Sequence, residues 1–232
     1  MWTIEEMKAR GKDAFKKNYW PSVVAAFILS VLAGGTGAAI SNSSSTTTVT
    51  TTDGTLESIP PETMAIIATA VIGTVLLAFA VSLLLKIFLF NPLETGCNRF
   101  FKKNVENPPA PLGLIGESFN DYGRVFMTMF LRDLFTSLWT LLLIVPGIMK
   151  AYSYRMVPFI VKDNPELTPQ EVLALSTKMM AGNRWQSFKM DFSFIGWLLL
   201  GILTLNVVNL FWTFPYMYNT NAALYLKLKE QM

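Results

Sequence analysis

The chain has 232 residues, of which 52% are hydrophobic and 15% are charged, and its formal net charge is +3. Because an average soluble domain has roughly 25% charged residues, this composition excludes an ordinary soluble fold and indicates an all-α, polytopic helical membrane protein. Histidine is absent and Cys97 is the only cysteine, which excludes histidine-based catalysis, an internal disulfide, and metal sites built from histidine or several cysteines.

The first 20 residues carry charges throughout and lack the apolar core and cleavage site of a signal peptide. Their apolar residues, among them Ile4, Met7 and Phe15, are interspersed with lysines, a pattern that predicts an amphipathic leader helix on a membrane surface. Pro21 then opens the first apolar run, 22–40. Its roughly 19 residues are long enough to cross a ~30 Å hydrocarbon core.

Residues 41–63 form a Ser/Thr-rich linker without lysine or arginine, so an external loop is predicted there. The second apolar run, 64–90, is longer than a span requires. The next segment, 91–124, is polar, and its proline-rich centre forbids a continuous helix. We therefore expect 91–124 to be a cytosolic loop.

A third apolar run starts near Val125 and ends at Pro146-Gly147, a strong turn signal. The fourth run, 148–161, would cover only about 21 Å as a helix. Residues 162–190 are polar again and predict a second cytosolic loop.

A short cytosolic helix is predicted inside this second loop. Thr168-Pro169-Gln170-Glu171 matches a capping box with proline at the first helical position, and Gly182 is placed to end the helix. The fifth run, 192–208, and the sixth, 211–228, are then separated by a weak break from Asn206 to Asn209.

The distribution of positive charge favours six spans in three hairpins, with both termini in the cytoplasm. This arrangement places 15 of the 19 lysines and arginines in cytoplasmic segments, as the positive-inside rule requires. Merging the last four runs into two spans lowers the number to 11. The fourth and sixth runs are short or polar, so a re-entrant or tilted arrangement stays open for either. The whole chain, 1–232, is expected to be one membrane domain.

Several short motifs resemble the domain-of-unknown-function 975 family, a family of integral membrane proteins found mostly in Gram-positive bacteria. The resemblance extends over nearly the whole chain except the Ser/Thr-rich linker, and it implies a bacterial cell membrane location but no activity. The motifs are the leader 5–20, NPLETGCNRFF (91–101), Pro146-Gly147, Tyr152-Ser153-Tyr154, Asp163-Asn164-Pro165, Met179-Met180 with Gly182, Ser193 to Trp197, and FPYMYNTNAALYLKL (214–228).

Charged residues within predicted spans are the first candidates for function. Lys86, Arg132 and Asp133 are predicted to form an intramembrane polar cluster, in which Asp133 meets Lys86 across helices. Arg132 and Asp133 are neighbours in sequence and do not face each other on a helix, so they are not expected to pair. The cluster either fixes helix register as a buried ion pair or lines a path for a substrate. Lys86 lies only a few residues from the inner end of the second span, so a lysine that snorkels to the membrane surface is the alternative for this residue.

Two further groups of cations are candidates for contact with anionic lipid. Arg99, Lys102 and Lys103 stand beside two phenylalanines near the predicted cytoplasmic face, where they either hold anionic headgroups or only set the topology. Lys150 and Arg155 flank two tyrosines towards the predicted outer side, and either anchor the interface or line a pocket for a lipid phosphate or another anion.

The sequence contains no pattern for catalytic residues, a metal site, a cofactor or nucleic-acid binding. The leading hypothesis is therefore a non-enzymatic membrane protein that binds a lipid, a protein partner or a second copy of itself, as an accessory factor or scaffold. The alternative is a small transporter or channel whose path is lined by polar residues of the third span. A membrane enzyme that uses carboxylates on lipid headgroups is the third hypothesis.

Overall fold

The computed structural model describes residues 2–41 and 61–232, so most of the predicted external loop, 41–63, lies outside the described residues. Every regular element within the described ranges is helical. The elements are α1 (Ile4–Lys17), α2 (Tyr19–Ser41), α3 (Pro61–Leu85), the π-helix η1 (Lys86–Phe90), α4 (Asn91–Glu106), the 3-10 helix η2 (Leu112–Phe119), α5 (Tyr122–Leu142), α6 (Ile144–Ser153), α7 (Val157–Asp163), α8 (Pro169–Met180), α9 (Arg184–Phe192), α10 (Ile195–Leu203), the π-helix η3 (Asn209–Thr213) and α11 (Phe214–Glu230).

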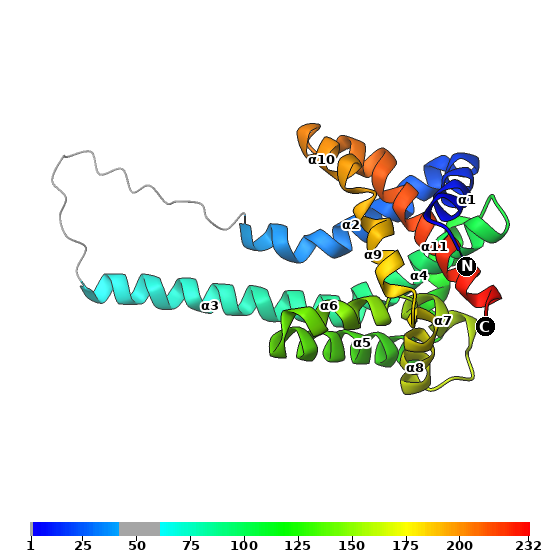
Figure 1. Cartoon of the computed structure of the whole chain (residues 1–232). Helices are drawn as coiled ribbons and strands as arrows, with labels where there is room; N and C mark the ends of the chain where they lie inside the picture. Colours follow the sequence, from blue (N-terminus) through cyan, green and yellow to red (C-terminus); the bar gives the residue numbers. More distant parts are fainter. Residues whose placement is uncertain (1, 42–60) are drawn as a thin grey trace.

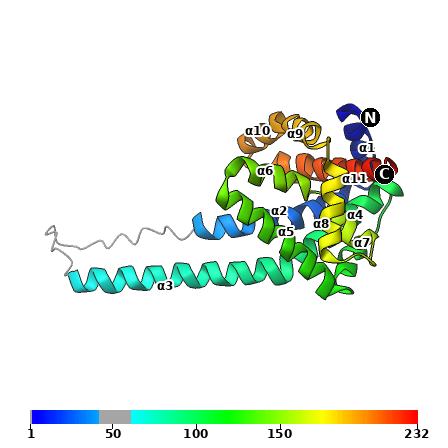
Figure 2. The same ribbon diagram turned by 60° about the horizontal axis from the view of Figure 1, so that its bottom comes forward.

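The helices form a packed body from which apolar elements project in one direction. Figure 1 shows α2 and α3 extending away from the body, while the N- and C-termini lie near each other at its opposite end. The turned view in Figure 2 preserves this arrangement. The apolar surface and the two chain ends are thus separated along the length of the molecule.

Three buried asparagines connect the helices at the centre of the body. The Asn18 amide, between α1 and α2, donates to the Asn104 side-chain oxygen on α4 at 2.7 Å. The Asn104 amide donates in turn to Asn219 on α11 at 2.9 Å and to the backbone oxygen of Ala14 at 3.1 Å. All three asparagine side chains are buried, and a buried amide must be hydrogen-bonded to avoid a desolvation cost. The network therefore specifies how α1, α4 and α11 pack together.

The leader is helical, but its apolar side faces protein rather than a membrane surface. Met7 and Phe15 of α1 are fully buried, and α1 packs along α11. The contact is close because Gly11 has no Cβ: a Cβ at this position would lie 2.6 Å from the backbone nitrogen of Thr220. The expected surface-lying helix is thus corrected to one that is docked on the last helix of the chain.

Helix α3 continues without a break through η1 into α4, so the first half of the predicted 91–124 loop is helical. The continuous helix from Ala65 to Glu106 has 42 residues, and none of its most apolar window is buried. The π-helix η1 also takes part in a side-chain hydrogen bond. The Tyr122 hydroxyl donates to the Phe88 carbonyl oxygen of η1 at 2.7 Å. The polar residues of 91–106 are helical because they pack within the body, where Cys97, Phe100 and Phe101 are buried.

The apolar runs around Pro146-Gly147 form a short helical hairpin. Helix α5 ends at Leu142, Leu143 is extended, and α6 begins at Ile144. The returning helix packs closely, since a Cβ on Gly147 would lie 2.6 Å from the Cα of Thr140. The predicted fourth run is then divided between α6 and α7, with a turn after Ser153.

A second hairpin joins α10 to η3 at the predicted weak break. Leu205 and Asn206 both have positive φ, 50° and 64°, a backbone conformation that ends a helix. Only two of the described helices, Ala65–Glu106 and Tyr122–Leu142, are long and apolar enough to cross a membrane. These match the second and third of the six predicted spans.

The boundaries of the predicted short helix are confirmed by α8. Its capping box is complete, with the Thr168 hydroxyl accepting from the Glu171 backbone and the Glu171 carboxylate accepting from the Thr168 backbone. Gly182 follows the helix with φ of +77°. The apolar side of α8 packs on α5 and α7, where Val172 and Met180 are fully buried.

Candidate functional site

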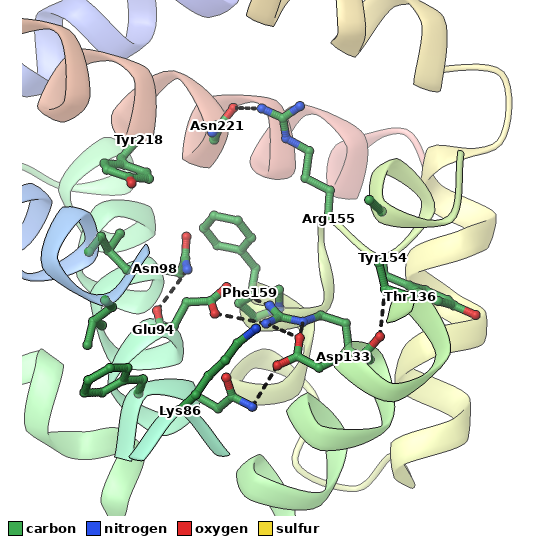
Figure 3. A pocket seen from close by; sticks show the side chains of 17 residues that line it. Lys86, Glu94, Asn98, Asp133, Thr136, Tyr154, Arg155, Phe159, Tyr218 and Asn221 are labelled. Carbon is green, nitrogen blue, oxygen red and sulfur yellow. Dashed lines mark hydrogen bonds and ion pairs between the residues drawn. The ribbon is translucent and has the colours of Figure 1, made fainter. Parts of the chain in front are cut away.

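A polar cavity of about 470 Å³ lies where α2, η1, α4, α5, α7 and α11 meet. Figure 3 shows its lining, with Lys86, Glu94 and Asp133 on one side and Tyr218 and Asn221 on the other. The cavity contains all three residues of the predicted polar cluster together with residues that were not predicted. Its ionisable lining side chains are Lys86, Glu94, Arg132, Asp133, Tyr154, Arg155 and Tyr218.

Arg132 is the centre of an ion-pair network on one wall of the cavity. Its guanidinium donates to both carboxylate oxygens of Glu94, at 2.6 and 3.0 Å. It also donates to Asp133 at 2.9 Å, and the second Asp133 oxygen accepts from the Asn91 amide at 3.1 Å. The expectation that Arg132 and Asp133 do not pair is therefore corrected. Adjacent backbone positions point apart, but the long arginine side chain folds back and its forked donors reach two carboxylates at once.

Lys86 lines the same cavity but does not form the expected ion pair with Asp133. Both Asp133 oxygens are already used by Arg132 and Asn91. Within the described residues, Lys86 has neither a hydrogen-bond nor an ion-pair partner, and its side chain is exposed. Figure 3 shows it directed towards the centre of the cavity. Lys86 is thus a positive charge without a direct partner, beside a network in which one arginine faces two carboxylates.

Arg155 connects the turn between α6 and α7 to two other helices. Its guanidinium donates to both oxygens of Asp191 on α9, at 2.6 and 2.7 Å, and to the Asn221 side-chain oxygen on α11 at 2.6 Å. The Tyr152 hydroxyl also donates to Asp191, at 2.8 Å. Lys150 instead lies 5.5 Å from the ring centroids of Trp139 and Tyr154. Of these two predicted cations, only Arg155 lines the cavity.

Carboxylates of the protein form ion pairs with all three predicted lipid-contact cations, Arg99, Lys102 and Lys103. Arg99 pairs with Glu117 at 2.8 Å, and Lys103 pairs with Glu106 at 2.9 Å. Lys102 is 7% exposed and donates to Asp163. The predicted lipid contact is therefore corrected for Lys102, because a buried and paired ammonium cannot reach a headgroup.

Asp163, at the end of α7, is the acceptor that holds this part of the body together. Besides Lys102, it accepts hydrogen bonds from the Tyr225 hydroxyl at 2.8 Å and from Lys229 at 2.7 Å. Burial raises the pKa of Asp163, but the hydrogen bonds from Lys102 and Lys229 outweigh it and hold that pKa below its ordinary value. The carboxylate thus stays charged and joins α4, α7 and α11.

An exposed aromatic row on α9 was not predicted from the sequence. Trp185 is 66% exposed, Phe188 and Phe192 are also exposed, and consecutive rings along the row lie 5.3 and 6.4 Å apart. The signal was present, because positions 185, 188 and 192 fall on one side of a helix. The cavity residues Glu94, Tyr218 and Asn221 gave no such signal, since their place is set by contacts distant in sequence.

The described residues, 2–41 and 61–232, contain no group of three or more Asp, Glu or Cys side chains placed to hold a metal ion. No curated protein and no solved structure matches the chain. A family model described as "Protein of unknown function (DUF975)" matches residues 113–232, which include α5 to α11 and both short hairpins. The chain therefore belongs to the DUF975 family, as its short motifs predicted.

Proposed function

We propose that this protein is an integral membrane protein of the cell membrane that acts by binding lipid or a partner rather than by catalysis. The observation that carries this proposal is α3, whose apolar residues project from the body and are not covered by any described part of the chain. A large exposed apolar surface is stable in lipid or against another apolar surface, and not in water. A packed body with an attached membrane helix fits an accessory or scaffold protein.

The lengths of the projecting elements support a mixed topology. Helix α3 has 25 residues and would be about 37 Å long, enough to cross a ~30 Å core. Helix α6 has 10 residues and α10 has nine, so each reaches only about 15 Å. Helix α5 is long enough to span, but its first half packs in the body, where Val125 and Met129 are buried, so only its second half is left to enter the bilayer. We therefore propose that α2 and α3 cross the bilayer, while the α5–α6 and α10–η3 hairpins enter it halfway and return.

Exposed aromatic side chains support the placement of the body at the cytoplasmic interface. Trp20 begins α2 and Trp185 belongs to the α9 row, and both are exposed. Tryptophan is enriched where a membrane meets water. Both termini and the polar segments between hairpins then lie in the cytoplasm, which preserves the positive-inside distribution.

Cysteine labelling tests the proposed topology. Single cysteines at Ser45, Val145 and Val207, in a Cys97→Ser background, would be treated in intact cells with a membrane-impermeant maleimide. We expect labelling at Ser45 only, because Val145 and Val207 lie near the tips of hairpins that stop within the bilayer. Labelling at all three positions would instead support six complete spans.

Membrane fractionation tests the broader proposal. The protein should stay with the membrane pellet after washing with sodium carbonate at high pH, which removes peripheral proteins. Recovery in the soluble fraction would contradict an integral membrane protein and all topology derived from it.

A further inference from the structure

We propose that the cavity between α4, α5, α7 and α11 binds the phosphate of an anionic phospholipid, with Lys86 as the cation that pairs with it. This inference rests on the proposed function, because it requires the cavity to lie at the membrane. It adds a ligand class and a site to a protein that we otherwise describe only as lipid- or partner-binding.

Among the described residues, the one cation of the lining without a partner is the group that an anion would meet. The two arginines already have carboxylate partners, Arg132 with both Glu94 and Asp133, and Arg155 with Asp191. Lys86 has no partner within the part of the chain that the structure describes, yet it lines the cavity beside them. An anion that enters would pair with Lys86 without breaking either of these ion pairs.

The neutral polar groups also favour an anion over a cation. The carboxylates of Glu94 and Asp133 accept from Arg132 and Asn91. By contrast, the Tyr218 hydroxyl makes no hydrogen bond to any described residue, and Asn221 uses its oxygen for Arg155 while its amide hydrogens stay available. The groups left for a ligand thus include the donors of Lys86, Tyr218 and Asn221, which suit the oxygens of a phosphate, and one amide acceptor, the side-chain oxygen of Asn98.

The apolar part of the lining favours a lipid over a free anion. Leu29 and Leu32 of α2 and Phe90 of η1 lie on the same cavity as the charged residues. A site lined by both charged and apolar side chains fits an amphiphile, whose headgroup and first acyl carbons need different surroundings. The volume of about 470 Å³ falls within the range of ligand pockets.

Lys86, the first residue of η1, lies at a depth that suits the phosphate of a lipid. Lys86 is the first charged residue after Glu62, and it lies four residues before the end of the second apolar run, 64–90. In the proposed topology this end lies where lipid phosphates lie. Its side chain is exposed and can therefore meet a lipid from the bilayer.

Native mass spectrometry of the detergent-purified full chain tests the site. The wild type, Lys86→Gln, Lys86→Arg and Lys178→Gln would each be titrated with phosphatidylglycerol, phosphatidylcholine and inorganic phosphate. Lys178 is exposed on α8 and lines no part of this cavity, so it controls for loss of one surface charge. We expect Lys86→Gln to weaken phosphatidylglycerol binding about fivefold or more, the factor for roughly 1 kcal/mol. Lys86→Arg and Lys178→Gln should bind like wild type.

The other outcomes are equally decisive. The site would be overturned if Lys86→Gln and Lys178→Gln lost phosphatidylglycerol binding equally, or if neither lost it. It would also be overturned if the wild type bound phosphatidylcholine as tightly as phosphatidylglycerol. Lys86-dependent binding of inorganic phosphate without binding of phosphatidylglycerol would overturn the lipid source and leave a free-anion site. The lipid-binding measurement and the carbonate extraction test different claims. A negative result for the lipid site would therefore leave the proposal of an integral membrane protein intact.

Discussion

In the buried contact between α4 and α11, the Asn104 amide nitrogen lies 2.9 Å from the Asn219 side-chain oxygen that accepts its hydrogen bond. Asn104→Ala would remove this bond and leave the amides of Asn18 and Asn219 without their shared partner. We expect a loss of about 1–3 kcal/mol in the free energy of unfolding, the cost of unsatisfied buried polar groups. Thermal melting followed by tryptophan fluorescence measures this, with Gln170→Ala on the exposed side of α8 as the control. Equal melting temperatures for wild type and Asn104→Ala would contradict the role of the network.

Gly11→Ala should detach the leader helix from α11. The new Cβ would meet the backbone nitrogen and Cα of Thr220 at 2.6 and 2.7 Å, and backbone atoms cannot move aside without separating the helices. We expect faster tryptic cleavage after the leader lysines, followed by mass spectrometry of the fragments. Gly113→Ala, where a Cβ has nothing within 4 Å, should leave the cleavage rate unchanged. Equal rates in the two variants would show that the close approach is not required.

Asp163→Asn should destabilise the protein at neutral pH but not in acid. The pKa of Asp163 is held below its ordinary value, so its charged form stabilises the fold above the unfolded-state pKa of about 3.9. This contribution is lost as pH falls below that value towards the folded-state pKa. At pH 7 the variant leaves Lys102 buried without its main partner, and we expect a cost of about 3–5 kcal/mol.

The measurement is the difference in unfolding free energy between wild type and Asp163→Asn from pH 7 to pH 3. The difference should shrink below about pH 4. Asp13→Asn is the matched control, because Asp13 pairs with Lys17 on the exposed side of α1, where such pairs contribute at most about 1 kcal/mol. A difference for Asp163→Asn that stays constant across the range would refute the linkage.

Glu94→Gln should destabilise the protein more than Asp133→Asn. Glu94 accepts two charge-assisted hydrogen bonds from Arg132, which are worth roughly 1.5 kcal/mol or more each. Each amide variant keeps one acceptor oxygen. The new amide nitrogen of Glu94→Gln would face a donor of Arg132, whereas that of Asp133→Asn can face Asn91, whose own amide can turn its oxygen towards it. The loss for Asp133→Asn should therefore be about half as large. Melting temperatures of the two variants test the order. If Asp133 lines a transport path instead, Asp133→Asn would abolish ion flux in proteoliposomes without changing the melting temperature.

The local features of the fold could be predicted from the sequence. The Thr168–Glu171 capping box, the helix end near Gly182 and the breaks near Pro146 and Asn206 depend on residues within one turn of each other. Their signals are therefore complete in a short stretch of sequence. The predicted boundaries at these positions lie within a few residues of the helix ends.

The tertiary contacts could not be predicted. Residues 91–106 look like a loop because they are polar, yet they form α4 because Asn104 and Lys102 find buried partners far along the chain. The members of the polar cluster could be predicted, since Lys86, Arg132 and Asp133 all line the cavity, but their pairing could not, since Asp133 pairs with Arg132. Glu94 was missed because its partner Arg132 is 38 positions away. Positive-inside counting also cannot separate a hairpin that crosses from one that turns back, because both return the chain to the same side.

The unbroken helix from Ala65 to Glu106 has a mechanical consequence. Over 42 residues it is about 63 Å long, and its outer part, α3, would be held by lipid while its inner part, α4, carries Glu94 in the cavity wall. Helices that are longer than the bilayer is thick adjust by tilting, and a change of about 5° would move the far end of α3 by about 3 Å. If α3 tilts about η1 when the bilayer thickness changes, the tilt would change the geometry around Arg132.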